Sequence, residues 1–476
     1  MASIDIPFPR SSQPGSQPGE GLGRLLNRYC EIDGEITQWR LVPGLVAFTD
    51  TLIGGPRGAI DVNGILYDAR ANSALTVTTG GTVTPLAGTL NGTRAVTWAK
   101  NNRSPTPDVV CVTEAGAFSV SPSTVSNYPD TSLPQPNSVS FLDGYFLFTI
   151  GDGRVFASGV NDIWVSDADH TQNALAFAVA DLSGGLVRGT SANGLFYAWG
   201  KKACTVYNDA ATSPFPLARA GVIQIGLAGA TAIAGFDPGW GLQQYFVATD
   251  NTVRRLDGFS ASVVSNKDVE RALEAQTDKT QIEMSCYVSA GRPTVVVKGP
   301  SFAYELNAAT GYWNERQSAN LTTWRASRSI YFNGNWYFGD TLTTQILQIS
   351  DAAFNELGTS FTARLESGPV KQYPNRLRCL AAYFDFTSGQ GTPGGTSDSM
   401  NPSVFVSSSI DGGASWSTPV LRRDLGAQGN FQKMIRVNRI GGIASQHGIR
   451  FRLDSSSPVY STFRGGRCDV NILKAP

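Results

Sequence analysis

The chain has 476 residues, its 38 Lys and Arg balance 38 Asp and Glu, and only 16% of its residues are charged, against roughly 25% in an average globular protein. Because one simple core stops growing at about 250–300 residues, we expect two domains or one large repeat-built domain with additions. Lys and Arg are nowhere dense enough for a nucleic-acid groove, and with only two histidines, His170 and His447, the sequence argues against a clustered metal site.

The charge is unevenly distributed along the chain. Residues 360–476 hold 14 Lys and Arg against 7 Asp and Glu, whereas the first 359 residues hold 24 against 31. We expect an acidic body joined to a basic end to steer contacts between subunits. The low charge also suits permanent protein contacts, because neutral polar groups are less costly to desolvate than charges. A secreted β-protein with neutral loops has a similar composition and stays open as an alternative.

The cysteines and the termini add two expectations. The six cysteines are spread along the chain without a CxxC pair, which is typical of buried thiols and not of a disulfide framework. The first 23 residues carry no apolar run, so we expect no signal peptide, and no stretch reaches the roughly 20 apolar residues of a membrane span. We therefore expect a protein made in the cytosol that stays soluble or assembles there.

Residues 1–23 are rich in Pro, Gly, Ser and Gln. Such a segment buries too little surface to fold alone. We predict a flexible N-terminal arm, which is either a mobile tail or a segment that orders against a neighbouring subunit.

From residue 24 the sequence shows a recurring unit. Apolar cores centre on Phe146, Phe196, Phe246, Val296 and Tyr337, at separations of 50, 50, 50 and 41 residues. A period of about 40–50 residues is expected of a four-stranded propeller blade.

Two earlier units, which contain residues 59–69 and 95–120, bring the count to six or seven blades. Asx-Gly dipeptides that favour hairpins accompany the cores: Asp143-Gly144, Asn193-Gly194, Asp257-Gly258 and Asn333-Gly334. We therefore predict a β-propeller over residues 24–359. An irregular β-sandwich with evenly spaced strands is the alternative.

One helix is predicted within this array. Ser265 and Asp268 match a capping box, and Val269, Ala272 and Leu273 lie on one face. We expect this helix to cover an edge between blades.

Near residue 360 the character of the sequence changes. A low-complexity loop over 387–402 is surrounded by strand patterns with partial alternation, such as RCLAAYFDF and GIRFRLDSSSP. We predict a separate C-terminal β-sandwich over 360–476, so that the whole chain is all-β.

The sharpest short motif runs from Ser409 to Trp416 and fits S-x-D-x-G-x-[ST]-W, the Asp box known from sialidases. We interpret it as a structural turn in which Asp411 accepts backbone hydrogen bonds, Gly413 takes a strained φ and Trp416 packs beneath. The box lies away from the chemistry even in sialidases, so it indicates a β-hairpin and not catalysis.

The sequence offers no catalytic constellation. A glycosidase needs two carboxylates that face one sugar bond, and nothing in the sequence pairs its acidic residues, which include Asp162, Asp167, Asp169, Glu270, Glu305 and Glu315. Neither histidine lies near a G-x-S-x-G elbow, and no Walker or Rossmann motif is present. We predict no catalytic, cofactor-binding or metal-binding residue and a protein that is not an enzyme.

Several segments, in their order along the chain, carry a family resemblance. They are NRYCEIDGEITQWRLVPGLVAF and GPRGAIDVNGILYDA near the start, FAYELNAATGYWNERQ and YFNGNWYFGDTLTTQILQIS in the middle, and SSSIDGGASWSTP and RIGGIASQHGIRFRLDSSSPV near the end. Together they resemble the packaged-DNA stabilisation proteins, also called tail hub or nozzle proteins, of short-tailed bacteriophages.

The resemblance implies a structural virion protein of the phage tail, assembled in the bacterial host cytoplasm. It implies a homo-oligomeric ring, a hexamer, below the portal and head-to-tail adaptor proteins. Such a ring would extend the channel through which double-stranded DNA passes transiently and without specificity, retain packaged DNA before ejection, and dock tail fibres or tailspikes, with a tail needle as a further partner. The rival hypothesis, which rests on the Asp box, is a sialidase-like carbohydrate-active or glycan-binding β-propeller.

Overall fold

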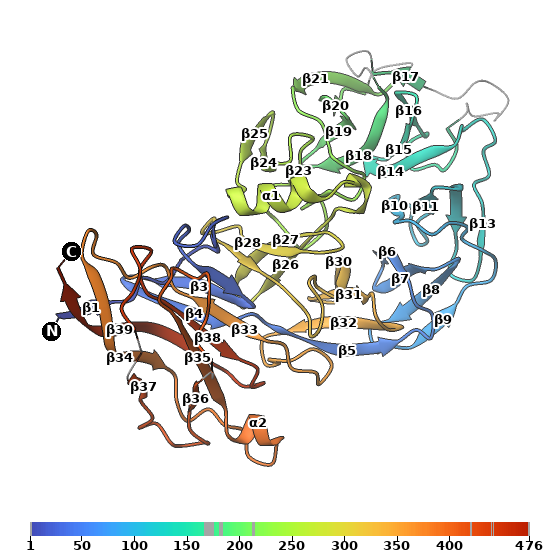
Figure 1. The fold of residues 1–476 in the computed structure, drawn as a ribbon. Helices are drawn as coiled ribbons and strands as arrows, with labels where there is room; N and C mark the ends of the chain where they lie inside the picture. Colours follow the sequence, from blue (N-terminus) through green and yellow to red (C-terminus); the bar gives the residue numbers. More distant parts are fainter. Residues whose placement is uncertain are drawn as a thin grey trace.

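The computed structural model describes residues 2–165, 176–179, 184–211, 215–418, 421–438, 440 and 442–474. These residues form an all-β protein in which a propeller is joined to a second body where blue N-terminal strands lie beside orange and red C-terminal ones (Figure 1). The predicted β-propeller is confirmed, and the described strands form seven blades.

Each blade is an antiparallel sheet whose first-named strand lies at the propeller axis and whose last lies at the rim. Blade 1 consists of β6 (Pro56–Val62), β7 (Ile65–Arg70), β8 (Ser73–Thr78) and β9 (Val83–Pro85). Blade 2 consists of β10 (Thr97–Lys100), β11 (Val109–Thr113), β12 (Gly116–Val120) and β13 (Val125–Asn127). Blade 3 consists of β14 (Pro136–Leu142), β15 (Tyr145–Ile150), β16 (Arg154–Ala157) and β17 (Ala176–Ala178). Blade 4 consists of β18 (Leu186–Ala192), β19 (Leu195–Gly200), β20 (Cys204–Asp209) and β21 (Leu217–Ile223). Blade 5 consists of β22 (Ile233–Ala234), β23 (Tyr245–Val247), β24 (Val253–Asp257) and β25 (Ser260–Val263). Blade 6 consists of β26 (Glu283–Ser289), β27 (Arg292–Lys298), β28 (Ala303–Asn307) and β29 (Trp313–Glu315). Blade 7 consists of β30 (Ala326–Phe332), β31 (Asn335–Asp340), β32 (Gln345–Ser350) and β5 (Gly44–Asp50).

The second strand of each blade explains the repeat seen in the sequence. In β15, β19 and β31 every residue except the first is buried. A strand with a neighbour on each edge and a blade on each face is covered from all sides, so its sequence is a continuous apolar run. The five predicted cores all fall in second strands, namely β15, β19, β23, β27 and β31.

Tight turns join the first two strands of the blades. Asp143 and Gly144, between β14 and β15, have φ of 46° and 99°, and positive φ at both central residues gives the strand twist that a hairpin needs. The predicted turns Asn193-Gly194 and Asn333-Gly334 also have positive φ at both residues. The fourth predicted turn, Asp257-Gly258, instead joins the third and fourth strands of blade 5, β24 and β25, and only its glycine has positive φ.

The propeller is closed by a strand from the other end of its sequence. β5 precedes blade 1 but pairs with β32 of blade 7, from Asp50 opposite Gln345 to Gly44 opposite Ser350. Blade 1 and blade 7 also share a hydrophobic cluster that includes Leu75 and Ile330. Backbone pairing and apolar packing therefore both fasten the first blade to the last.

The predicted helix is present as α1 (Lys267–Ala275), which is followed by the short 3₁₀-helix η1 (Lys279–Gln281). Val269 and Leu273 are buried as expected. The predicted capping pair was wrong: Asn266 is the N-cap and accepts the backbone N–H of Val269 at 3.0 Å, while the Ser265 hydroxyl donates to Glu270 at 3.0 Å. Asn266 reaches the orphan N–H because it sits one residue closer to the first helical turn.

Two further sheets form the second body. One contains β3 (Arg28–Asp33), β4 (Ile36–Leu41), β39 (Thr462–Leu473), β34 (Arg376–Phe386) and β37 (Ile435–Asn438), with β1 (Ala2–Asp5) on β39. The other contains β2 (Arg24–Leu26), β33 (Ala363–Glu366), β38 (Arg450–Ser455), β35 (Ser403–Ser409) and β36 (Leu421–Asp424). The short helix α2 (Ser397–Met400) lies in the loop before β35.

These two sheets pack face to face. Their inward residues form one hydrophobic cluster, to which Leu365, Val406 and Phe451 contribute from one sheet and Ala382 and Phe463 from the other. Two sheets around a shared core make a β-sandwich, and residues 360–476 supply β33–β39 of it.

The sandwich also takes strands from the beginning of the chain, which differs from the predicted division. β1 pairs with β39 from Ala2 opposite Val470 to Asp5 opposite Arg467, and β3 and β4 extend the same sheet. The part of the predicted flexible arm that the structure describes, residues 2–23, is therefore ordered against the rest of the chain, and the first propeller strand begins at Gly44. The arm folds because it adds a strand and apolar side chains such as Ile6 to an existing sheet and core, which its own composition could not provide.

Candidate functional site

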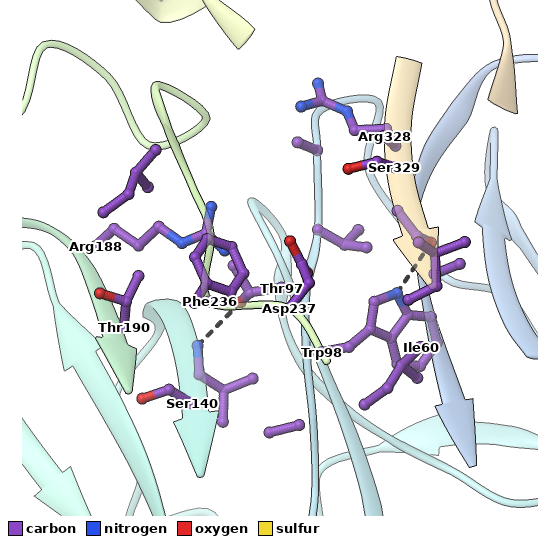
Figure 2. A pocket seen from close by; sticks show the side chains of 18 of the residues that line it. Ile60, Thr97, Trp98, Ser140, Arg188, Thr190, Phe236, Asp237, Arg328 and Ser329 are labelled. Carbon is purple, nitrogen blue, oxygen red and sulfur yellow. Dashed lines mark hydrogen bonds between the residues drawn. The ribbon is translucent and has the colours of Figure 1, made fainter. Parts of the chain in front are cut away.

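The propeller axis contains a cavity of about 440 Å³ that all seven blades line (Figure 2). Residues of the first strands β6, β10, β14, β18, β22, β26 and β30 face it. Aromatic rings of Trp98, Phe236 and Tyr331 share the wall with polar side chains of Arg188 and Asp237. A concave site with apolar walls and a few convergent polar groups is the usual form of a ligand-binding pocket.

One loop fills part of this channel. β22 is only two residues long, and the next residues, 235–239, turn toward the axis, where Phe236, Asp237 and Pro238 line the cavity. Gly239 has φ of 83°, and a Cβ built on it would lie 2.4 Å from Cγ of Tyr331 on β30. We call residues 235–239 the plug loop, because they line the cavity and lie so close to Tyr331 of blade 7 that only glycine fits at 239.

Arg188 on β18 interacts electrostatically with Asp237 of the plug loop, and both side chains line the cavity (Figure 2). The Arg188 guanidinium carbon lies 4.7 Å from the centroid of the Phe236 ring, and Nη1 donates to the Ala230 carbonyl at 2.8 Å. Burial lowers the pKa of Arg188 to about 10. Burial also raises the pKa of Asp237 to about 6, which the positive charge of Arg188 partly opposes. The Cys286 thiol is 3.9 Å from the Asp237 carboxylate.

Arg328 enters the cavity from β30 with an unusual backbone. Its φ is 58°, and the register of β30 shifts between Ser327 and Ile330. Its backbone N–H donates to Glu283 at 2.7 Å, and its Nη1 lies 3.6 Å from the same carboxylate. Burial acts against the charge of Glu283, but Arg328 and Lys298 outweigh it and hold its pKa below the usual value. A bulge of this kind redirects a side chain, and here it leaves Arg328 near the axis.

The acidic residues considered in the sequence lie elsewhere. Glu305 accepts hydrogen bonds from Tyr287 and Asn314, at 3.0 and 2.8 Å. Among the residues that line the cavity, none of the four described candidates, Asp162, Glu270, Glu305 and Glu315, appears. The other three residues singled out, Asp167, Asp169 and His170, lie outside the described residues. Within the part of the chain that is described, no group of three or more His, Cys, Asp or Glu could hold a metal ion.

The second site of interest is the junction between propeller and sandwich. β29, the outer strand of blade 6, pairs in parallel with β2, and β2 pairs with β33. One nine-stranded sheet therefore runs from β26 at the propeller axis to β36 of the sandwich. Arg24 on β2 forms a bidentate ion pair with Glu315 on β29, in which Nε donates at 2.9 Å and Nη2 donates at 2.6 Å. Bidentate arginine–carboxylate pairs are stronger than pairs with a single hydrogen bond.

A buried charge cluster lies beside this junction. Arg316 is fully buried and donates to the Pro43 carbonyl at 2.8 Å and to Glu356 at 3.2 Å. The Trp324 indole N–H donates to the same Glu356 oxygen at 2.9 Å, and the guanidinium lies 4.9 Å from the Trp324 ring centroid. The cluster ties blade 6, blade 7 and the segment before β5 together.

The N-terminal residues reinforce the same junction. The Ser12 hydroxyl donates to Glu315 at 3.1 Å, its backbone N–H donates to the Trp313 carbonyl at 2.7 Å, and its carbonyl accepts from Asn266 at 3.0 Å. Residue 12 therefore contacts both blade 6 and the start of α1. The chain between β1 and β2 therefore connects the sandwich to blade 6 and to α1.

The three residues predicted for a structural turn, Asp411, Gly413 and Trp416, lie in the loop after β35. Asp411 accepts hydrogen bonds from Ser409 at 2.7 Å and from the Ser415 backbone at 2.9 Å. Burial works against the charge, but these hydrogen bonds prevail and hold the pKa of Asp411 at about 2. Gly413 has φ of 102°, and the Arg452 guanidinium lies 4.9 Å from the half-buried Trp416 ring.

The turn also contacts the N-terminal segment. The Gly19 backbone N–H donates to the Gly412 carbonyl at 2.9 Å. A Cβ at Gly412 would lie 2.5 Å from Cβ of His447. His447 therefore belongs to the packing around this loop, far from the cavity on the propeller axis.

The sequence reasoning did not identify Arg188, Asp237 or Arg328. They lie in three different blades, and single arginines and aspartates at the start of a strand or in a loop carry no distinctive pattern. The available signal was G-F-D-P-G at 235–239, in which two glycines enclose a proline where a blade's first strand should continue.

Comparison with known families gives one match. Residues 25–353 match the family described as Phage_stabilise: Bacteriophage P22 Gp10, beta-propeller. No curated protein sequence matches the chain. Among the described residues, each helix is too short or too polar to cross a bilayer.

Several solved structures align with the fold at low similarity. A streptogramin B lyase structure has a TM-score of 0.42 and 12% identity, and the alignment covers 64% of this chain and 97% of that one. The WD40 propeller domain of Doa1 has a TM-score of 0.42 and 8% identity over 65% of this chain and 97% of its own. The computationally designed Ika8 protein has a TM-score of 0.37 and 12% identity over 72% and 98%.

Proposed function

This chain belongs to the Bacteriophage P22 Gp10 β-propeller family of phage tail structural proteins, and on that premise we propose that it is the ring-forming subunit of a tail hub or nozzle. In this role six copies assemble below the portal and adaptor proteins. The ring extends the DNA channel, helps to retain the packaged genome and carries tail fibres or tailspikes, with no catalytic step of its own.

The observation that carries this proposal is the continuous sheet between the two bodies. A nine-stranded sheet passes from the propeller axis into the sandwich, and the Arg24–Glu315 pair and the buried Arg316 fasten both sides of it. Domains joined by a flexible linker move relative to one another, whereas a shared sheet resists bending at the joint. A rigid subunit suits a spacer that must keep a channel open under load.

The small cavity on the propeller axis argues against a path for DNA through the propeller. A cavity of about 440 Å³ is the size of a small-molecule pocket, while the major groove of B-DNA alone is about 12 Å wide. The plug loop forms part of the wall of this cavity through Phe236, Asp237 and Pro238. The DNA therefore passes between subunits, along the axis of the ring, and not through any propeller.

Charge supplies a contact between neighbouring subunits in this proposal. With the sandwich strands assigned, residues 42–359 hold 20 Lys and Arg against 26 Asp and Glu, and the rest of the chain holds 18 against 12. A closed ring uses head-to-tail interfaces between two different surfaces. We propose that the acidic propeller of one subunit contacts the basic sandwich of the next subunit.

Electron microscopy of the purified protein and of virions tests the proposal. The expected result is a closed ring in both samples, situated below the portal in the virion, with fibres or spikes attached. A protein that stays monomeric and is missing from purified particles would overturn it.

A further inference from the structure

The wall of the cavity on the propeller axis carries hydroxyl groups that can still bond to a ligand. Thr97 and Ser140 each accept one hydrogen bond, from Val139 N–H at 2.9 Å and from Ser191 at 3.1 Å. Ser329 accepts the Cys286 backbone N–H at 3.2 Å. Within the described residues each of these hydroxyls keeps its O–H to donate and one lone pair to accept. The free O–H groups favour a ligand with acceptor oxygens.

Two guanidinium groups strengthen that preference. In the described structure the Nε atoms of Arg188 and Arg328 are buried without a hydrogen-bond partner. Leaving a buried charged donor unpaired is costly, so a group that accepts from these arginines stabilises the site. Both side chains line the cavity, from β18 and β30 (Figure 2).

The charges around the cavity favour an anionic ligand. The charged side chains that line it are four basic and two acidic ones, so their sum is positive: Arg57, Lys100, Arg188, Arg328, Asp61 and Asp237. A carboxylate is attracted to this wall, whereas a dianion such as phosphate brings a second negative charge close to Asp237.

We propose that this cavity is a binding site for a sugar acid, whose single carboxylate is held by Arg188 and Arg328. A planar carboxylate matches the planar guanidinium fork, which favours it over a tetrahedral anion. The aromatic walls, Trp98, Phe236 and Tyr331, suit the apolar face of a sugar ring, and the hydroxyls donate to its oxygens. A volume of about 440 Å³ accommodates a monosaccharide.

Calorimetric titration of the full-length protein tests this with glucuronate, glucose and inorganic phosphate as probes. We expect glucuronate to bind, glucose to bind at least tenfold more weakly because it lacks the charge, and phosphate to bind at least tenfold more weakly because of its shape and second charge. Equal or tighter binding of glucose or phosphate, or no binding of glucuronate, overturns the proposal. A uronate-terminated oligosaccharide distinguishes a free acid from a chain end: binding indicates that chain ends are admitted, and no binding beside bound glucuronate indicates a free acid.

Variants separate the site from a general loss of fold. R188Q and R328Q should each weaken glucuronate binding roughly 10- to 100-fold, as expected for a lost hydrogen bond to a charged group. The matched control R271Q, on the exposed surface of α1, should bind as the wild type does. D237N removes the anion that competes for Arg188, so it should tighten binding, a gain that misfolding does not produce. Wild-type affinity in R188Q and R328Q, or weaker binding in D237N, contradicts the assignment.

Discussion

Asp237 is the titratable side chain on the propeller axis whose protonation changes near neutral pH. It interacts with Arg188 on β18 and with the Cys286 thiol on β26, and it shares the cavity wall with Arg328 on β30. Burial raises its pKa in the folded protein to about 6, above about 3.9 in an unfolded chain. The folded state therefore holds this proton more tightly than the unfolded state does.

This shift predicts a pH-dependent stability contribution. Between pH 4 and pH 6 the folded protein binds the Asp237 proton and the unfolded chain does not, so the contribution of Asp237 to stability falls as pH rises through that window. In D237N this term is absent. The melting temperature of D237N relative to that of the wild type should therefore be higher at pH 7.5 than at pH 4.5. A difference between the two proteins that is the same at both pH values would refute the assignment.

A second residue-scale prediction concerns the buried pair at the junction. E356A removes the carboxylate that accepts from the fully buried Arg316 at 3.2 Å and leaves Glu305, 3.9 Å from Nε, as the remaining counter-charge. Breaking a buried ion pair from one side costs about 3–5 kcal/mol, and because Glu305 remains we expect a loss at the lower end of this range. The control E274A, on the exposed face of α1, should stay within about 0.5 kcal/mol of the wild type. Denaturant unfolding measures both, and similar values for the two variants would contradict the role of Glu356 at the junction.

At the scale of elements, the second strands carry the packing between blades. Phe196 on β19 is fully buried in a cluster that joins blades 3 and 4, with Leu147 on β15 among its members. F196A should cost about 3–5 kcal/mol of unfolding free energy. F259A changes a side chain that is 50% exposed and should cost clearly less, so comparable losses in denaturant unfolding would show that the blades do not depend on this strand.

The N-terminal segment gives the second prediction at this scale. Deletion of residues 2–23 removes β1 from the edge of β39, the apolar contacts of Ile6 and the hydrogen bonds of Ser12 to Glu315 and Trp313. We expect the melting temperature to fall by several degrees, since about 1 kcal/mol shifts it by roughly 2–4 °C in a protein of 150–250 residues and by less in a longer chain. R10A, a substitution at an exposed position of the same segment, is the control. An unchanged melting temperature after the deletion would mean that the segment is a free arm.

How far the sequence predicts these elements depends on how local their signals are. The cores of β15, β19 and β31 could be found because each is a short apolar run beside an Asx-Gly turn, all within about ten residues. β1 and β4 could not be assigned to the sandwich, because their partner β39 lies more than 400 residues away, and β3 joins the same sheet only through β4. The plug loop was missed for the same reason: Gly239 is required by Tyr331, which belongs to another blade.

At the scale of the whole molecule, the acidic propeller and the basic sandwich indicate how copies meet. Long-range attraction between exposed charges is screened by salt, with a Debye length of about 10 Å at 0.1 M and 3 Å at 1 M. Assembly of purified subunits should therefore weaken as the salt concentration rises from about 0.05 to 1 M, as sedimentation velocity would show. Assembly that is independent of salt would exclude charge as the source of the contact.

In the ring that we propose, rigid propeller subunits surround an axis that carries the DNA, and no DNA passes through a propeller. Cryo-electron microscopy of the intact virion tests this directly. We expect a closed ring of this protein below the portal, duplex density along the ring axis, and the plug loop in place in every propeller. Virions without the protein, or DNA density inside a propeller whose plug loop has moved away, would contradict it.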